Sequence, residues 1–269
     1  MLRTRVLTAA VALPILLVML WLGPPYFTLL VGLASLVGHL EFYRLARLAG
    51  LAPFAALGTA GGLTLVAAAA LERPEAAGPI LAGEALLAGF GLALRGKTAG
   101  ALGDWAATLG GTIYCGLIFS YYIRLRGLPA GFEWSLVTFL VTFVVDTAAF
   151  FVGRRLGRHR LAASISPNKT VEGFLGGLAA GPLTAAALCA LLGLPLGWWA
   201  AAGLGLGLAF AGQVGDLAES AFKRSAGVKD SGRLFPGHGG LLDRVDSLAF
   251  NGVVAFYLIS GLIPGIPRG

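Results

Sequence analysis

The sequence predicts an all-α, polytopic integral membrane protein with about nine transmembrane helices and a cytoplasmic N-terminus. The 269 residues are 57% hydrophobic and only 12% charged, whereas a soluble domain carries about 25% charged residues. Apolar segments recur along the whole chain, and most approach the roughly 20 residues that a helix needs to cross a bilayer. A third observation, the uneven distribution of cations among the connecting loops, predicts the orientation.

The expected transmembrane segments follow one another along the chain. The first comes after Arg3 and Arg5 and resembles a signal peptide, but no small-residue cleavage site follows, so we expect a retained helix. The third and fourth are only mildly apolar because Ala and Gly dominate them, and Glu84 interrupts the fourth. The nine segments run approximately over Val6–Leu22, Phe27–Leu45, Pro53–Leu71, Pro79–Leu94, Ala107–Ile123, Trp134–Val152, Glu172–Leu194, Leu196–Ala218 and Leu248–Ile263.

Lysine and arginine residues are concentrated in alternate loops. With the N-terminus inside, sixteen of the 20 Lys and Arg residues fall in cytoplasmic segments, as the positive-inside rule requires. The two largest polar loops, Arg154–Lys169 and Lys223–Arg244, are then both cytoplasmic. This distribution explains the net charge of +7 without a nucleic-acid partner. We therefore expect a multi-pass protein of the inner (cytoplasmic) membrane that acts at its cytoplasmic face.

The polar content divides the chain into two regions. Residues 1–130 are expected to form N-terminal transmembrane helices, and residues 131–269 a C-terminal catalytic region with cytoplasmic active-site loops. Cys115 and Cys189 each lie in an apolar segment, so we expect two small buried residues rather than a disulfide or a metal site. Glycine pairs four residues apart favour close helix packing over a substrate groove lined by backbone: Gly58 and Gly62, Gly173 and Gly177, Gly203 and Gly207.

The stretch from Gly91 to Thr98 matches the P-loop pattern GxxxxGK[ST]. A P-loop follows a β-strand and opens a helix in an α/β domain. Here the glycines end an apolar segment, and no β-rich segment is expected nearby. We therefore interpret Lys97 as a positive-inside charge rather than as a phosphate ligand.

Several charged or titratable residues stand inside expected membrane segments. A buried charge in a bilayer is costly unless it is paired or bound, so Asp146 in the sixth segment is a candidate functional residue. Its alternative is a structural ion pair with Lys169 or an arginine. In the second segment, His39 and Glu41 suggest a proton relay, but exposure at the membrane interface or a local pair is the favoured interpretation.

A polar turn at Ser164–Gly173 leads into the seventh segment. It contains Ser166, Asn168 and Lys169, and Thr170 is in position to cap the following helix. Hydroxyl, amide and ammonium groups beside a helix N-terminus suit an anion. An ordinary capped cytoplasmic loop is the alternative.

The densest polar run of the chain spans Ser220–Asp246, directly after an apolar segment. Just before and within it, Asp216, Glu219 and Lys223 share one helical face. Glu219 and Lys223 have the spacing of an i, i+4 salt bridge, which leaves Asp216 as the better candidate for a metal ligand. Cations hold phosphates and aspartates hold magnesium, so the run predicts chemistry on a phosphorylated substrate.

The end of this run repeats the pattern. Asp243 and Asp246 stand three residues apart at a helix start, where the helix dipole alone favours carboxylates. Together with Asp216 they could instead hold a divalent cation, since magnesium takes few carboxylates plus substrate phosphates. His238 lies in a glycine-rich turn, where it is either a phosphate contact or proton shuttle, or a hydrogen-bonded turn residue.

The polar run, with two upstream segments, resembles the signature of phosphatidate cytidylyltransferases, also called CDP-diacylglycerol synthases. The match spans the whole signature from Ser220 to Asp246, and the segments from Asp146 to Gly153 and from Ser166 to Gly173 resemble the other two polar motifs of the family. Asn168 departs from the family, in which Lys is commoner at this position. The resemblance covers about Val141–Gly252, and the N-terminal half is similar only in consisting of apolar helices.

The resemblance implies that CTP and phosphatidate react to give CDP-diacylglycerol and pyrophosphate. It also implies Mg²⁺, alone or with a second metal ion, an all-helical fold within membrane lipid, and frequent homodimers. By this resemblance Asp216 and Asp246 are metal ligands, with Asp243 close by. Phosphate-binding residues would be Lys169, Lys223, Arg224 and Lys229.

Two other functions remain open at this point. One is a related CTP-dependent transferase or kinase that acts on a prenyl lipid, and the other is an ion or phosphate transporter. In the favoured function the candidate catalytic residues are Asp216, Lys223, Asp243 and Asp246, of which Asp216 and Asp246 bind the metal. The candidate substrate-binding residues are Asp146, Ser166, Asn168, Lys169, Arg224, Lys229, Asp230, His238 and Arg244.

Overall fold

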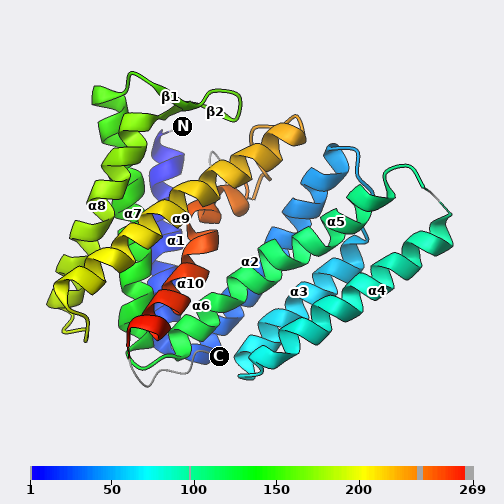
Figure 1. The fold of residues 1–269 in the computed structure, drawn as a ribbon, viewed down its shortest axis with the longest axis horizontal. Helices are drawn as coiled ribbons and strands as arrows, with labels where there is room; N and C mark the ends of the chain where they lie inside the picture. The colour runs from blue at the N-terminus through cyan, green and yellow to red at the C-terminus, as the bar shows by residue number, and fades with distance from the viewer. Residues whose placement is uncertain (1, 97, 235–238, 264–269) are drawn as a thin grey trace. The chain divides into compact units, whose positions relative to one another are not determined.

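The structure is a computed structural model that describes residues 2–96, 98–234 and 239–263, with side chains described from residue 10 onward. Helices make up most of the described chain (Figure 1). They are α1 (Leu2–Leu22), α2 (Pro24–Leu48), α3 (Ala55–Ala70), the 3₁₀ turn η1 (Pro74–Ala76), α4 (Ala77–Arg95), α5 (Ala101–Gly111), the π-helical segment η2 (Thr112–Leu117), α6 (Ile118–Gly127), α7 (Gly131–Leu156), α8 (Val171–Leu191), α9 (Trp198–Ser225) and α10 (Leu242–Leu262). The two short strands are β1 (Arg160–Ala162) and β2 (Ser166–Thr170).

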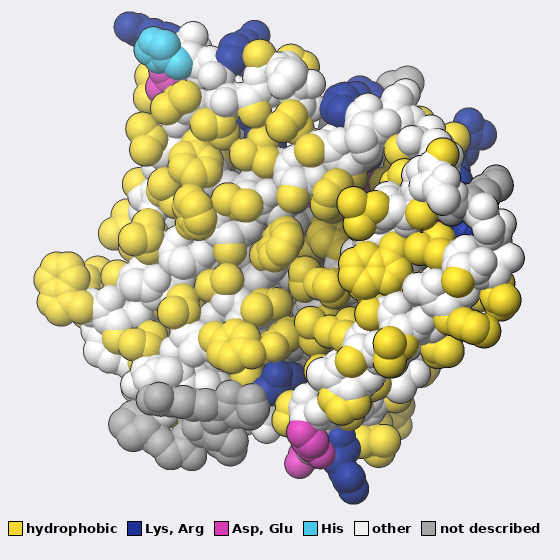
Figure 2. Space-filling model, turned by 45° about the vertical axis from the view of Figure 1, so that its right-hand side comes forward, with side chains coloured by type: hydrophobic (Ala, Val, Ile, Leu, Met, Phe, Trp, Pro, Cys, Tyr) yellow, Lys and Arg dark blue, Asp and Glu magenta, His cyan; other side chains and the backbone are white. Residues whose placement is uncertain are grey.

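Seven helical stretches of the described chain are long and apolar enough to cross a membrane. Two further apolar stretches, Ala10–Leu22 of helix α1 and the helix Ala55–Ala70, lie where the first and third segments were predicted. Large apolar side chains such as Trp199 and Leu191 are exposed on the helices, and Figure 2 shows hydrophobic side chains over most of the visible helix surface. An all-α, multi-pass membrane protein is therefore confirmed.

The chain divides into two compact units that do not follow the order of the sequence. The first unit contains Met1–Arg124 together with Phe222–Arg244, and the second contains Leu125–Ala221 together with Val245–Arg268. Helices α9 and α10 therefore contribute residues to both units. Most of the polar run Ser220–Asp246 belongs to the first unit, and its two ends belong to the second.

In the first unit, α2 and α3 pack on each other and on η2 (Figure 1). The Tyr43 hydroxyl donates a 2.7 Å hydrogen bond to the Thr108 carbonyl, and the Thr112 hydroxyl donates one of 3.0 Å to the Gly58 carbonyl. A Cβ at Gly58 would collide with Tyr43, and one at Gly62 would collide with His39. Both glycines therefore permit close packing, as the sequence predicted.

In the second unit, α7 and α8 pack along much of their lengths (Figure 1). A Cβ at Gly173 would lie 2.7 Å from the Ala149 carbonyl, and one at Gly177 would lie 3.0 Å from the Gln213 amide. On α9, Gly207 stands against Leu258, whereas nothing lies within 4 Å of a Cβ at Gly203. Close packing is thus confirmed for these glycines except Gly203. Cys115 and Cys189 are buried free thiols, also as predicted.

Two local features bear on sequence predictions. Strands β1 and β2 form an antiparallel hairpin between α7 and α8 (Figure 1), so the segment that was interpreted as a polar turn or capped loop contains a small sheet. The P-loop-like segment begins inside helix α4, which contains Gly91 and ends before Gly96, a left-handed residue with φ of 63°. Gly91 lies against the Phe54 ring, which is a packing role, and Lys97 is outside the described residues.

Candidate active site

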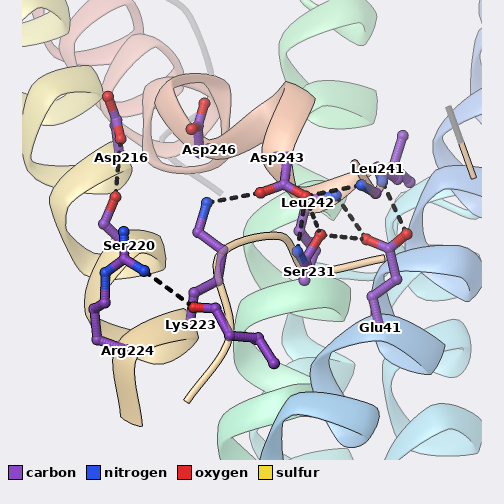
Figure 3. A network of polar contacts seen from close by, with 12 residues as sticks. Glu41, Asp216, Ser220, Lys223, Arg224, Ser231, Leu241, Leu242, Asp243 and Asp246 are labelled. Atoms are coloured by element: carbon purple, nitrogen blue, oxygen red, sulfur yellow. Dashed lines mark hydrogen bonds and ion pairs between the residues drawn. The ribbon is translucent and has the colours of Figure 1, made fainter. Parts of the chain in front are cut away.

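Three aspartates and one lysine of the second unit form what we call the carboxylate cluster: Asp146 on α7, Lys169 on β2, Asp216 on α9 and Asp246 on α10. The Lys169 ammonium lies 2.6 Å from an Asp216 oxygen. The negative charges of Asp216 and Asp146 both act on Asp246, which places the three carboxylates close together. Figure 3 shows Asp216 and Asp246 extending from their separate helices. Four segments that are far apart in the sequence thus meet at one group of charges.

Glycine on α9 allows Asp216 and Asp246 to come together. A Cβ at Gly215 would lie 2.6 Å from the Asp246 carbonyl oxygen, and one at Gly212 would lie 3.2 Å from the Ser247 carbonyl. The backbones of α9 and α10 are therefore in close contact where the two aspartates arise. Small residues permit this kind of approach between helices in lipid.

Serines of α9 and α10 orient the carboxylates. The Ser247 hydroxyl donates to Asp146 at 3.2 Å, and the Ser247 amide donates to Asp246 at 2.7 Å. The Ser220 hydroxyl donates to Asp216 at 3.4 Å (Figure 3). Asp146 is an exposed side chain, and Asp216 and Asp246 are partly exposed. Each aspartate therefore remains accessible to a ligand even though it belongs to a helix long enough to span a membrane.

The hairpin between α7 and α8 positions Lys169. Arg160 pairs with Thr170 and Ala162 with Ser166 in the antiparallel register. Thr170 then caps α8, because its hydroxyl accepts a 3.1 Å hydrogen bond from the Gly173 amide. This cap was predicted from the sequence. It fixes the end of β2, one residue beyond Lys169.

A second contact holds the other end of this loop. The Glu172 carboxylate accepts hydrogen bonds from the Arg158 and His159 amides at 3.0 and 3.3 Å, and it lies 2.6 Å from His159 Nδ1. The chain before β1 is thereby held to the first turn of α8. His159 therefore has a structural contact within the basic loop.

In the first unit, Lys223 and Asp243 form a buried ion pair with a 2.7 Å separation. The other Asp243 oxygen accepts three hydrogen bonds, each of 2.8 Å, from the Ser231 amide, the Ser231 hydroxyl and the Gly240 amide. Both Asp243 oxygens are thus engaged by the protein (Figure 3). This geometry gives Asp243 and Lys223 a role in holding the segment between α9 and α10, and their catalytic assignment stays a prediction.

The remaining predicted residues are mostly at the surface. Arg224, Lys229, Asp230, Arg244 and Asn168 are exposed, and Ser166 is partly exposed. Arg224 donates a 3.3 Å hydrogen bond to the Val228 carbonyl (Figure 3). His238 lies outside the described residues, so its role stays a prediction. Exposed cations of this kind are accessible to an anionic substrate.

Glu41 was assigned wrongly from the sequence. Exposure at the membrane interface or a local pair was favoured, but Glu41 is only 7% exposed and its partners are distant in the sequence. His39 is fully buried, and its Nδ1 lies 2.7 Å from the Ser35 carbonyl, which is a local contact. Glu41 accepts hydrogen bonds from Ser231, Leu241 and Leu242, about 200 positions away in the sequence. The only sequence signal was a carboxylate within an apolar segment, and the same signal flagged Asp146.

The described residues contain no group of three or more His, Cys, Asp or Glu side chains in metal-binding geometry. This does not oppose magnesium, which is usually held by one or two carboxylates plus substrate phosphates and water. Asp216 and Asp246, with Asp146 nearby, supply carboxylates of this kind. Bringing such acids together inside apolar helices costs free energy, which favours a cationic ligand.

Comparison with known proteins gives consistent matches. The cytidylyltransferase family matches residues 3–262. A Staphylococcus aureus (strain COL) protein named phosphatidate cytidylyltransferase is 33% identical over 255 residues, which cover 92% of this chain and 95% of the relative. A Staphylococcus haemolyticus (strain JCSC1435) protein of the same name is 34% identical over 255 residues, with the same coverage.

A third relative shows a shorter and stronger similarity. The Staphylococcus epidermidis (strain ATCC 12228 / FDA PCI 1200) protein named phosphatidate cytidylyltransferase is 43% identical over 147 residues, which cover 55% of this chain and 56% of the relative. The longer matches include the N-terminal helices. The resemblance that the sequence analysis confined to about Val141–Gly252 therefore extends over nearly the whole chain.

Proposed function

This chain belongs to the cytidylyltransferase family, and we propose that it transfers the cytidylyl group of CTP to phosphatidate. A phosphate oxygen of phosphatidate attacks the α-phosphorus of CTP. The bond from this phosphorus to the bridging oxygen of the β-phosphate breaks as the new one forms. The products are CDP-diacylglycerol and pyrophosphate, and the leaving group carries away the electron pair of the broken bond.

The carboxylate cluster is the observation that carries this proposal. It brings Asp216 and Asp246, on helices that are apolar enough to span a membrane, together with Lys169 of β2. The lipid phosphate is already an anionic nucleophile, so the reaction needs no strong general base. Two anions must instead be neutralised and aligned, and that is mainly an electrostatic task.

We propose Mg²⁺ as the cofactor, with Asp216 and Asp246 as its protein ligands and Asp146 close by. Bound there, the ion would neutralise triphosphate charge and stabilise the pyrophosphate leaving group. The partial exposure of both ligands leaves room for substrate phosphates and water in the rest of the coordination shell. A second metal ion would need a further carboxylate ligand, which Asp146 would supply.

Cations of the chain are the proposed phosphate contacts of CTP. Lys169 belongs to the carboxylate cluster, and Ser166 and Asn168 would add neutral donors from β2. Arg224 and Lys229 of the first unit are proposed from the family resemblance alone. Lys169 is bound to Asp216 in the structure, so it would exchange this partner for a phosphate when the nucleotide arrives. The corresponding contacts of Asp230, His238 and Arg244 are proposed from their place in the signature alone.

The location follows from the two substrates. CTP is soluble and phosphatidate is a membrane lipid, so the reaction requires a site at the membrane surface that the cytosol reaches. We propose the cytoplasmic face of the inner membrane, in agreement with the cation distribution of the loops. Homodimer formation is a further proposal that rests on the family resemblance.

A direct assay tests the proposed function. The purified protein, in detergent with Mg²⁺, is given each of the four ribonucleoside triphosphates with phosphatidate, a prenyl alcohol or a prenyl phosphate. Pyrophosphate release that requires both CTP and phosphatidate is the expected result. Product formation only with a prenyl lipid would reassign the substrate, and nucleotide-independent ion flux without any product would indicate a transporter.

A further inference from the structure

We propose that Glu41 and Arg44 of α2 are positioning residues that hold the base of the α9–α10 connection in its working conformation. We define the loop base as Ser231, Gly240, Leu241 and Leu242, all of which belong to the first unit together with α2. The inference rests on the proposed function, because Lys229 and Arg224 near this base are the proposed phosphate ligands. It assigns a task in the reaction to a helix outside the signature.

The Glu41 carboxylate accepts three hydrogen bonds from the loop base. One oxygen accepts from the Leu241 amide at 2.9 Å. The other accepts from the Leu242 amide at 2.9 Å, and it lies 2.9 Å from the Ser231 hydroxyl, whose single hydrogen it shares with Asp243. Figure 3 shows the carboxylate directed at these donors. Glu41 therefore ties Ser231, which follows α9, to the residues that begin α10.

Arg44, one turn further along α2, holds the same serine. Its guanidinium donates a 2.9 Å hydrogen bond to the Ser231 carbonyl. Asp243 engages the amide and hydroxyl of Ser231 from α10. Every polar group of Ser231 is therefore bound, two of them by residues of α2, and Ser231 is fully buried.

The loop sequence fits around the Glu41 side chain. A Cβ at Gly232 or at Gly240 would collide with the Glu41 carboxylate. Any other residue at either position would displace the carboxylate or the loop. Both glycines are therefore explained by close approach to Glu41.

The electrostatics favour a fixed position for this loop. A buried carboxylate in a membrane-spanning helix is costly unless donors satisfy it, and Glu41 receives three. Two of them are amides at the start of α10, where the helix dipole also favours a negative charge. Arg233 and Lys229, on the two sides of Ser231, remain exposed. The buried Glu41 carboxylate, which we call the clamp, thus holds a segment whose cations Lys229 and Arg233 are exposed.

Substitution of Glu41 tests this clamp. In Glu41→Gln the side chain keeps its size, but its NH₂ group is a donor directed at other donors, so the loop base loses its anchor. Hydrogen–deuterium exchange of the Leu241 and Leu242 amides should accelerate by about tenfold or more, since a hydrogen bond to a charged group is lost. Glu41→Asp, which keeps the charge, should restore part of the protection.

Two matched controls separate the clamp from general destabilisation. Glu84 is also a buried carboxylate of the first unit, and its hydrogen bond comes from Thr112. Glu84→Gln should leave exchange at Leu241 and Leu242 unchanged. Arg44→Gln removes the hydrogen bond to the Ser231 carbonyl and should accelerate exchange of the Ser231 segment. Arg47, an exposed cation one turn beyond Arg44, provides the matched control, and Arg47→Gln should leave this exchange unchanged. Exchange in Glu41→Gln that equals the wild-type rate would overturn the inference, whether or not the enzyme is active.

Steady-state kinetics then link the clamp to the reaction. If the loop positions phosphate ligands, Glu41→Gln raises the KM for CTP by about tenfold and leaves the KM for phosphatidate unchanged. Partial unfolding would instead lower kcat with both KM values unchanged, and that result would overturn the positioning role. Absence of cytidylyl transfer in the wild type would overturn the proposed function separately, while the exchange data would still decide whether Glu41 holds the loop.

Discussion

Lys169 and Asp216 form an ion pair in which the ammonium nitrogen lies 2.6 Å from a carboxylate oxygen. The lysine comes from a short strand and the aspartate from α9, and both are about one-quarter exposed in their side chains. In the proposed reaction both partners acquire new ligands, a phosphate for Lys169 and a metal ion for Asp216. The proposed reaction therefore requires this ion pair to open when CTP and the metal ion bind.

The first prediction concerns Lys169. In Lys169→Gln one charge-assisted contact to CTP is lost, so the KM for CTP should rise about tenfold, with a smaller effect on the KM for phosphatidate. Steady-state kinetics in mixed micelles measure both constants. Arg155→Gln is the control, since it removes an exposed cation from the same loop. Equal changes in both variants would mean that only the loop's total charge matters.

A second prediction uses the glycines of α9. The extra methyl group in Gly215→Ala would lie 2.6 Å from the Asp246 carbonyl and should push α10 away from α9. We expect activity to fall at least about tenfold, because small displacements of catalytic groups have large effects. Gly203→Ala adds the same methyl group to the same helix where nothing lies within 4 Å, so its activity should be near that of the wild type. The idea fails if the two variants behave alike.

The P-loop-like segment supplies a negative prediction. Lys97→Ala and Thr98→Ala should each keep activity within about twofold of the wild type, because helix α4 precedes this segment where a P-loop requires a strand. The same CTP assay measures this. Elimination of nucleotide-dependent activity by either change would show that the motif binds phosphate after all.

Membrane topology gives a fourth prediction. Single cysteines at Ser164 and Arg233, in a variant with Cys115 and Cys189 replaced by alanine, should both react with an impermeant maleimide only from the cytoplasmic side. Both positions are exposed, whereas Ser231 is buried and unsuitable for labelling. The helices α8 and α9 lie between the two positions, and two crossings return the chain to the same side. Labelling from opposite sides would contradict the cytoplasmic location that is proposed for both loops.

How much the sequence reveals depends on the distance between interacting residues. Apolar length predicted the helices, and local spacing predicted the Thr170 cap and the glycine packing. The metal candidates Asp216 and Asp246 were recognised because each lies in a polar motif beside an apolar segment. Their mutual proximity is a tertiary property, and no local pattern encodes it.

Contacts between distant segments explain what the sequence analysis missed. Glu41 was expected at the membrane interface or in a local pair, because its partners Ser231 and Leu242 are about 200 residues away. The β1–β2 hairpin was missed because its strands have three and five residues and lack the alternating apolar pattern of a half-buried strand.

The carboxylates Asp216 and Asp246 test the central claim most directly. Asp216→Asn and Asp246→Asn keep the size of the side chain but remove a charge that holds the proposed metal, so Mg²⁺- and CTP-dependent formation of CDP-diacylglycerol should fall by about a hundredfold or more. Size-exclusion profiles and thermal unfolding should show that both variants are folded, and Glu75→Gln, which changes an exposed carboxylate, should retain full activity. Wild-type turnover in either purified aspartate variant would contradict the assignment of the carboxylate cluster as the reaction centre.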